Sequence, residues 1–147
     1  MRSRILALVL VVALTAATGV VALASSTANG LPSSSNGYAK WPRINGTPFT
    51  STGPLSSAHA GVKNVYASKR KVGKRYPNGT VIVKTIQRGR PKGMPDQVAV
   101  MRKRDGKWRY DEYELSGSTY RNLGFSQSLC QGCHQMARAN DYVFTKK

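Results

Sequence analysis

The sequence has only two cysteines, Cys130 and Cys133, and they stand close together near the C-terminus. A disulfide framework is excluded, because no cysteine remains to close a second loop. Acidic residues are also scarce, with 6 Asp and Glu against 23 Lys and Arg. This excess of positive charge favours anionic partners such as nucleic acid, anionic lipid or an acidic redox protein, although a solvated basic surface accounts for it equally well.

A long apolar run occurs only near the N-terminus. Arg2 and Arg4 precede an apolar stretch over residues 5–12, and Ala22-Leu23-Ala24 has the small-x-small pattern of a cleavage site. We therefore predict a signal peptide over residues 1–24 and an exported, periplasmic protein. The alternative is a retained membrane anchor, because the apolar character approaches the ~20 residues that span a bilayer. We expect contact with a membrane only if this anchor is retained. We do not expect a nucleic acid partner, because an exported protein seldom meets nucleic acid.

The rest of the chain is long enough for one domain. Residues 25–37 are mostly Ser, Asn, Gly and Pro and indicate a flexible linker, so the domain is expected over residues 38–147. Residues 38–54 suggest a short helix or an extended arm with turns. A short strand is predicted over Lys63–Ala67, and Ser68 is expected to cap one or two helical turns that run to Arg75.

Strand signals dominate the middle of the chain. A turn at residues 76–79 precedes Thr80–Ile86, a nearly continuous β-branched run. Two strands, residues 97–104 and 107–115, flank Asp105-Gly106, a pair that favours a type I′ turn because both positions need positive φ. A helix is predicted from Gln127 to about residue 139, capped by Ser126. The fold class is therefore α+β, mostly antiparallel β, with a C-terminal helix.

Cys130-Gln131-Gly132-Cys133-His134 is a C-x-x-C-H motif, which is typical of covalent heme c attachment. On one helical turn both thiols can join the same porphyrin, and the adjacent His134 can ligate the iron. A thioredoxin-like dithiol is disfavoured because a loop, not a buried strand, precedes the motif. A structural zinc site needs four ligands, and outside the motif His59 is the one remaining cysteine or histidine that could serve.

Only 13 residues follow His134, so the motif lies much later than in small electron-transfer cytochromes. Met136 is too close to His134 to reach the opposite side of a heme. His59, Met94 and Met101 remain candidates for a sixth ligand, and without one of them the iron has an open face. Helical cytochromes c′ share the late motif, but the strand signals here disfavour a four-helix bundle.

The chain resembles the cytochrome P-460 family, which includes the β-type cytochromes c′. The matching segments are NGTPF (45–49), VKNVYA (62–67), YPNGTVIVK (76–84), VAVMRK (98–103) and the terminal C-x-x-C-H. The resemblance implies a β-sandwich-like fold, heme c, a tendency to homodimers, and one of two activities. One is hydroxylamine oxidation with a lysine bonded to the porphyrin, and the other is nitric oxide binding without that bond.

Lys84 matches the lysine of that family signature. From the strand period it shares a face with Ile82 and Ile86, where a lysine is costly unless it is paired, neutral or chemically bound. Snorkelling to solvent or pairing with a heme propionate is the alternative. The family usually has an acidic residue after this lysine, whereas this chain has Thr85 and departs from the pattern at that position.

Other candidate site residues are Phe49, as an apolar cap over the heme, and Glu112 or Glu114, as a proton relay. Core packing for Phe49 and surface ion pairs for the glutamates are the alternatives. Three functions remain open: an oxidoreductase acting on hydroxylamine or a related nitrogen oxide, a nitric oxide binding protein, and an electron carrier with a sixth ligand.

Overall fold

The computed structural model describes residues 29–52, 57, 59–89 and 93–146. The predicted signal peptide, residues 1–24, lies outside the described residues, as do residues 25–28 of the predicted linker. Among the described residues, no helix is both long and apolar enough to cross a membrane.

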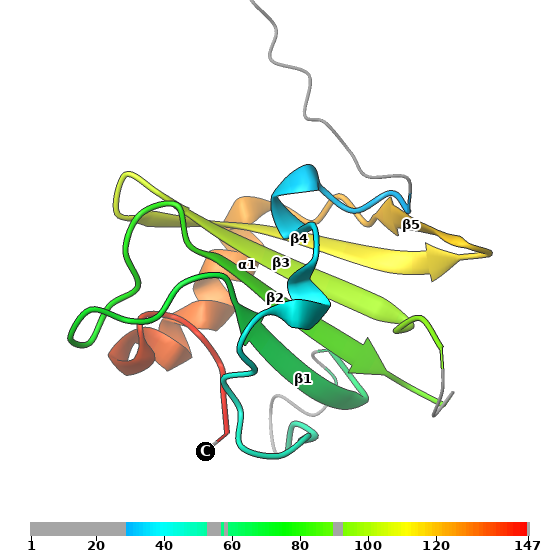
Figure 1. Cartoon of the computed structure of the whole chain (residues 1–147), viewed down its shortest axis with the longest axis horizontal. Helices are drawn as coiled ribbons and strands as arrows, with labels where there is room; N and C mark the ends of the chain where they lie inside the picture. Colours follow the sequence, from blue (N-terminus) through cyan, green and yellow to red (C-terminus); the bar gives the residue numbers. More distant parts are fainter. Residues whose placement is uncertain (1–28, 53–56, 58, 90–92, 147) are drawn as a thin grey trace, which may run out of the picture.

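The domain is built on one five-stranded antiparallel sheet (Figure 1). The strands follow one another in chain order: β1 (Val62–Ala67), β2 (Val81–Gln87), β3 (Gln97–Arg104), β4 (Lys107–Ser116) and β5 (Thr119–Asn122). Every neighbouring pair is antiparallel. This confirms the predicted fold class, a mostly antiparallel sheet with a C-terminal helix.

The turn between β3 and β4 has the predicted geometry. Asp105 and Gly106 both have positive φ, 52° and 72°, as a type I′ turn requires. β5 is a strand that the sequence did not reveal, because it has only four residues and one buried side chain, Tyr120.

Residues 68–75 are not helical, so that prediction is wrong. They form a tight turn closed by hydrogen bonds between Val72 and Arg75, with Gly73 at φ 60°. The hydroxyl of Ser68 accepts a hydrogen bond from the backbone N–H of Val81, at 2.9 Å, instead of capping a helix. This segment lacks an apolar stripe to bury, so nothing favours a helix over the turn.

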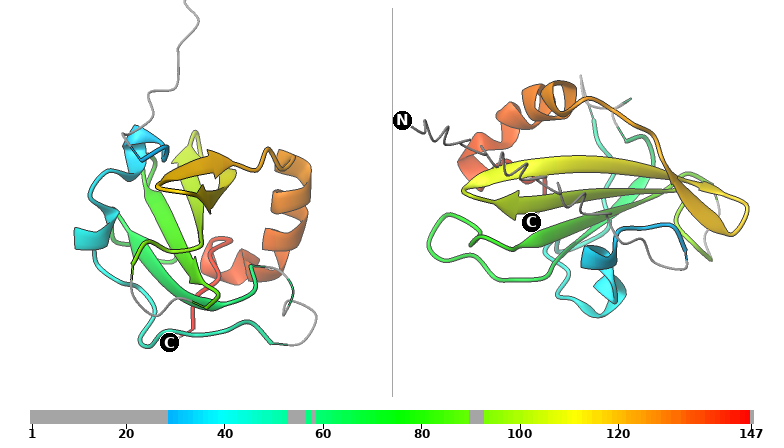
Figure 2. Two further views of the ribbon diagram at one scale, coloured as in Figure 1. Left: turned by 90° about the vertical axis from the view of Figure 1, so that its right-hand side faces the viewer. Right: turned by 90° about the horizontal axis from the view of Figure 1, so that it is seen from above.

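Both faces of the sheet are covered (Figure 2). α1 (Gln127–His134), the 3₁₀ helix η4 (Gln135–Asn140) and the C-terminal segment pack on one face. The core there consists of Val65, Ala67, Tyr76, Ile82, Met101, Trp108, Tyr110 and Val143. The second core, on the other face, consists of Leu31, Val81, Val83, Val98, Val100, Tyr113 and Tyr120.

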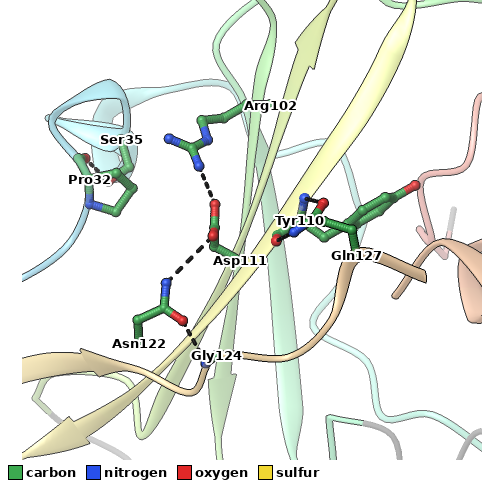
Figure 3. Close-up of polar contacts among 8 residues, drawn as sticks. All are labelled: Pro32, Ser35, Arg102, Tyr110, Asp111, Asn122, Gly124 and Gln127. Atoms are coloured by element: carbon green, nitrogen blue, oxygen red, sulfur yellow. Dashed lines mark hydrogen bonds and ion pairs between the residues drawn. The ribbon is translucent and has the colours of Figure 1, made fainter. Parts of the chain in front are cut away.

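The N-terminal part of the described chain covers that second face through two 3₁₀ helices, η1 (Ser33–Ser35) and η2 (Tyr38–Lys40). Leu31 is only 1% exposed, and the Ser35 hydroxyl donates to the Pro32 carbonyl at 2.7 Å (Figure 3). Leu31, Pro32 and Ser35 are buried, whereas residues 33, 34, 36 and 37 are exposed. Part of the predicted flexible linker is therefore packed against the sheet.

The start of α1 is fixed to the edge of β4. The Gln127 amide accepts a hydrogen bond from the backbone N–H of Tyr110, at 2.9 Å, and donates to its carbonyl (Figure 3). Ser126 caps the helix, as predicted, by accepting from the N–H of Leu129. The α-helix ends at His134 and continues as η4, whose backbone leaves helical geometry at Ala137.

Candidate functional site

The C-x-x-C-H motif lies on the last turn and a half of α1. Cys130 and Cys133 are free and half-buried. Cys130 packs against the core on the α1 face, and burial raises the pKa of its thiol. Cys133 lines a cavity, and His134, the last residue of α1, is buried beside it.

The imidazole of His134 is held in one orientation. Its Nδ1 lies 2.6 Å from the backbone carbonyl oxygen of Tyr142, and its ring packs against Tyr110 and Phe144, with centroid separations of 4.7 and 5.1 Å. Burial, and then the charge of Lys84, lowers the pKa of His134 to about 4. The ring is therefore neutral at pH 7, Nδ1–H donates to Tyr142, and Nε2 keeps the lone pair that a metal requires.

Two neighbouring cavities lie beside His134. The larger has a volume of about 230 Å³, and its walls include Phe49, His59, Lys84, Cys133, His134 and Phe144. The smaller, about 20 Å³, lies against the sheet, and its walls include Lys84, Ala99, Met101, Tyr110, Glu112 and His134. His59 and Lys84 line both, as does His134. The C-terminal helix and the sheet thus enclose one site.

The sheet side of this site is a single cross-strand row. Val65 pairs with Lys84, Lys84 with Ala99, and Ala99 with Glu112, so these four side chains point to the same face. The methyl group of Ala99 leaves space between the two longer side chains. Lys84 is 6% exposed, and burial, with a further contribution from the charge of Lys63, lowers its pKa to about 8.

The two predicted glutamates differ in position. Glu112 lines the smaller cavity, its side chain is 12% exposed, and its Oε1 lies 3.1 Å from Nδ1 of His59. Glu114 is 40% exposed and pairs with Arg88 at 3.4 Å. The structure therefore brings Glu112 into the site and leaves Glu114 at the surface.

Other predicted residues can now be placed. Phe49 lies on the wall of the larger cavity, where its backbone forms a bridge with Lys63. Met101 is buried beside the smaller cavity, whereas Met94 and Met136 are 37% and 61% exposed. Thr85 pairs with Asn64 and Val98, one position along from Lys84, so its side chain points to the opposite face of the sheet.

Three parts of the site were missed in the sequence: the carbonyl of Tyr142, the ring of Phe144 and the pairing of His59 with Glu112. A backbone carbonyl can accept a hydrogen bond whatever the residue type, so the sequence does not identify it. Phe144 stands in a short tail without periodicity, and His59 is 53 positions from Glu112. None of these contacts could be found without the tertiary fold.

The donor set fits a covalently attached heme better than the two rivals. Two thiols one helical turn apart adjoin a buried neutral imidazole whose Nε2 is uncommitted. Within the described part of the chain, no group of three or more His, Cys, Asp or Glu side chains is arranged to hold a metal ion, which disfavours zinc. The helix also follows the edge strand β5 of an antiparallel sheet, unlike a thioredoxin-type dithiol.

Comparison with known families agrees with this site. The family model described as Cytochrome P460 matches residues 35–145, which include the whole sheet and the C-x-x-C-H motif. A comparison with curated proteins found no match.

Proposed function

Because the chain belongs to the cytochrome P460 family, which implies heme c, we propose that it is an exported mono-heme enzyme that oxidises hydroxylamine or a related small nitrogen oxide. A heme attached through Cys130 and Cys133, with its iron ligated by Nε2 of His134, would supply the redox centre. The observation that carries the proposal is that Lys84, Glu112 and His59 gather in the space that His134 lines.

Glu112 and His59 are suited to accept protons. Removing two electrons from hydroxylamine, to the nitroxyl level, also releases two protons, and a buried site needs groups that take them up. Glu112 lies inside, and its partner His59 has a side chain that is 22% exposed. Glu112 can thus take up a proton inside the site, and the neighbouring His59 is the more exposed of the two side chains. Met101 and Ala99 keep the neighbouring wall apolar.

The position of Lys84 in both cavities beside His134 supports the covalent bond to the porphyrin that the family resemblance implies. Its lowered pKa means that a neutral, nucleophilic amine is accessible near pH 8. Bond formation removes one hydrogen from the amine and one from a porphyrin carbon, and an external oxidant such as peroxide takes up the two electrons. In the family pattern an acidic residue follows the lysine. In this chain Thr85 holds that position and points to the opposite face of the sheet, whereas Glu112 lies on the same face as Lys84.

A nitric oxide binding protein is the second candidate. It is favoured by the aromatic walls of the larger cavity, Phe49 and Phe144, because an uncharged diatomic ligand needs no proton acceptor. Under this alternative, Lys84 is not bonded to the porphyrin and there is no turnover.

The deciding experiment combines the ferrous absorption spectrum with the intact mass of the purified protein. A bond at Lys84 interrupts porphyrin conjugation, so the main band moves far to the red of ordinary ferrous heme c, and the mass falls by two hydrogens. Lys84→Leu should restore an ordinary spectrum and abolish hydroxylamine oxidation. Lys40→Leu is the control for the loss of a lysine, because Lys40 is exposed on η2, on the opposite face of the sheet, and lines neither cavity.

Three outcomes separate the functions. An ordinary wild-type spectrum with tight nitric oxide binding and no turnover supports the gas-binding protein. A low-spin, six-coordinate spectrum that becomes high-spin in His59→Ala identifies an electron carrier with His59 as sixth ligand. A red-shifted band with turnover, both lost in Lys84→Leu alone, supports the enzyme.

An enzyme of this kind needs an electron acceptor, and we propose an acidic redox protein that docks at the turn over residues 68–75. This basic turn exposes Lys69, Arg70, Lys74 and Arg75, contains no acidic residue, and carries Val72, 76% exposed, at its tip. Beside it lies a hollow of about 460 Å³ whose wall includes Lys71, Lys74 and Thr145, and Thr145 also lines the larger cavity of the site.

Charge reversal tests this docking surface. Lys74→Glu should lower the rate of electron transfer to an acidic plastocyanin several-fold at low ionic strength, and less in high salt, because exposed charges are screened. Arg121→Glu is the control, since it makes the same charge change on β5, at the far end of the sheet from the basic turn (Figure 1). If the two variants lowered the rate of electron transfer equally, the effect would come from the net charge of the protein, and the proposed docking surface would be wrong.

A further inference from the structure

The turn that follows η4 has an unusual backbone. Asp141 and Tyr142 are consecutive non-glycine residues with φ of 54° and 64°. The left-handed region is tolerated by Asp but is unfavourable for a bulky aromatic residue such as Tyr. The chain emerging from this turn places Val143 in the core, 1% exposed. Strain of this kind persists only where surrounding contacts hold it.

Backbone hydrogen bonds from Asp141 to Arg138 and from Tyr142 to Ala137 hold part of this turn, and the carboxylate of Asp141 ties it to the rest of the domain. Its Oδ2 lies 2.6 Å from Nζ of Lys103 on β3 and accepts the backbone N–H of Tyr76 at 2.8 Å. The side chains of Lys103 and Asp141 are each only 5% exposed. One buried carboxylate therefore ties the turn both to the sheet and to the segment before β2.

The turn aims one backbone group at the site. The carbonyl of Tyr142, the second left-handed residue, faces back toward α1 and accepts the hydrogen bond from Nδ1 of His134 at 2.6 Å. If Asp141 left this conformation, the adjacent peptide carbonyl would change direction. The hydrogen bond to His134 thus depends on a residue that does not touch it.

Stability alone explains the pair poorly. A buried ion pair is weak evidence for stabilisation, because well-packed apolar side chains of similar size are often as good. The neighbourhood, with Trp108 under the Lys103 amine and Tyr76 against Trp108, is otherwise apolar and could accept such side chains. What apolar side chains cannot do is hold the backbone of Asp141 and Tyr142 through a hydrogen bond to Tyr76.

We propose that the Lys103–Asp141 pair is a positioning device for the proximal ligand. It holds the strained turn so that the Tyr142 carbonyl accepts from Nδ1 of His134, and it thereby sets how strongly Nε2 donates electrons to the heme iron. A hydrogen bond at Nδ1 makes an imidazole a more basic ligand, which favours the oxidised metal. The inference rests on heme attachment at the C-x-x-C-H motif and not on the identity of the substrate.

The test uses the heme-loaded full-length protein and two properties that do not depend on turnover. These are the iron–histidine stretching frequency of the ferrous protein, by resonance Raman spectroscopy, and the midpoint potential, by spectroelectrochemistry. Asp141→Ala should shift the stretch to lower frequency and the potential upward. Lys103→Met should act in the same direction. Asp141→Asn should shift both less, because Asn tolerates the left-handed region and can accept from Tyr76.

Val98→Ala is the matched control for lost stability. Val98 is fully buried in the core on the opposite face of the sheet. If Asp141→Ala and Lys103→Met move neither property more than Val98→Ala does, the pair has only a structural role and the proposal fails. Should both variants fail to accumulate with heme, Lys103→Gln, which is shorter and uncharged and so weakens the contact with Asp141, decides by the same comparison. Loss of hydroxylamine turnover without these shifts would bear on the proposed function alone.

Discussion

The buried amine of Lys84 should make stability depend on pH in a way that a substitution can isolate. The perturbation is Lys84→Met in a heme-free Cys130→Ala/Cys133→Ala background, where the amine cannot be bonded to a porphyrin. Met has a similar length and no charge, so it removes the titrating group and keeps the apolar contacts of the stem.

The magnitude follows from the pKa. Burial lowers the pKa of Lys84 from 10.5 to about 8, which corresponds to about 3 kcal/mol at 1.36 kcal/mol per pKa unit. Since the folded-state pKa lies below the unfolded value, the unfolded chain binds more protons between pH 8 and 10.5. The free energy of unfolding contributed by Lys84 therefore rises with pH across that window and is constant below it.

Urea unfolding of the two proteins at pH 7, 9 and 10.5 measures this effect. The stability advantage of Lys84→Met over the parent should shrink by about 3 kcal/mol between pH 7 and 10.5. Other titrating groups are common to both proteins and cancel in the difference. A difference that stays constant over this range would show that the amine is solvated in the folded state, and the reasoning about a buried Lys84 would be wrong.

Three further predictions concern the helix, the attachment and the hairpin. Gln127→Ala leaves both backbone groups of Tyr110 without their side-chain partner and should cost about 1–3 kcal/mol, measured by thermal unfolding, whereas exposed Gln135→Ala should cost almost nothing. Cys130→Ala/Cys133→Ala should release all heme on acid extraction, and heme retained on the denatured chain would exclude these attachment points. Gly106→Ala, at φ 72°, should lower stability by roughly 1 kcal/mol, with unchanged heme content.

Much of the architecture was accessible from the sequence because local patterns specified it. The β-branched run of β2 predicted a strand, and six of its seven residues are buried. Asp105-Gly106 predicted the turn, since few residue pairs accept positive φ twice. Cys130, Cys133 and His134 were found by spacing alone, because the chemistry of the motif requires two thiols about one helical turn apart and a histidine directly after the second.

The failures occurred where tertiary contacts outweighed local composition. Ser68 resembles a helix cap, but its hydroxyl satisfies the N–H of Val81 on the neighbouring strand. Residues 29–37 resemble a linker, but Leu31 fills a space over the sheet that no local pattern discloses. β5 is held by pairing with β4, so its four residues need little strand propensity of their own.

The departure at Thr85 shows most clearly why the site could not be read along the chain. In a strand, the residue after Lys84 points to the opposite face, so an acid there could not lie beside the Lys84 amine across the site. The residues that lie beside the Lys84 amine are determined by the register of two strand pairs. In these pairs Lys84 lies opposite Ala99, and Ala99 lies opposite Glu112. A shift of one residue in either pair would turn Glu112 away from Lys84. The acid of this site is thus specified by sheet register, and the Asp105-Gly106 turn, which sets the pairing of β3 with β4, contributes to it from a distance.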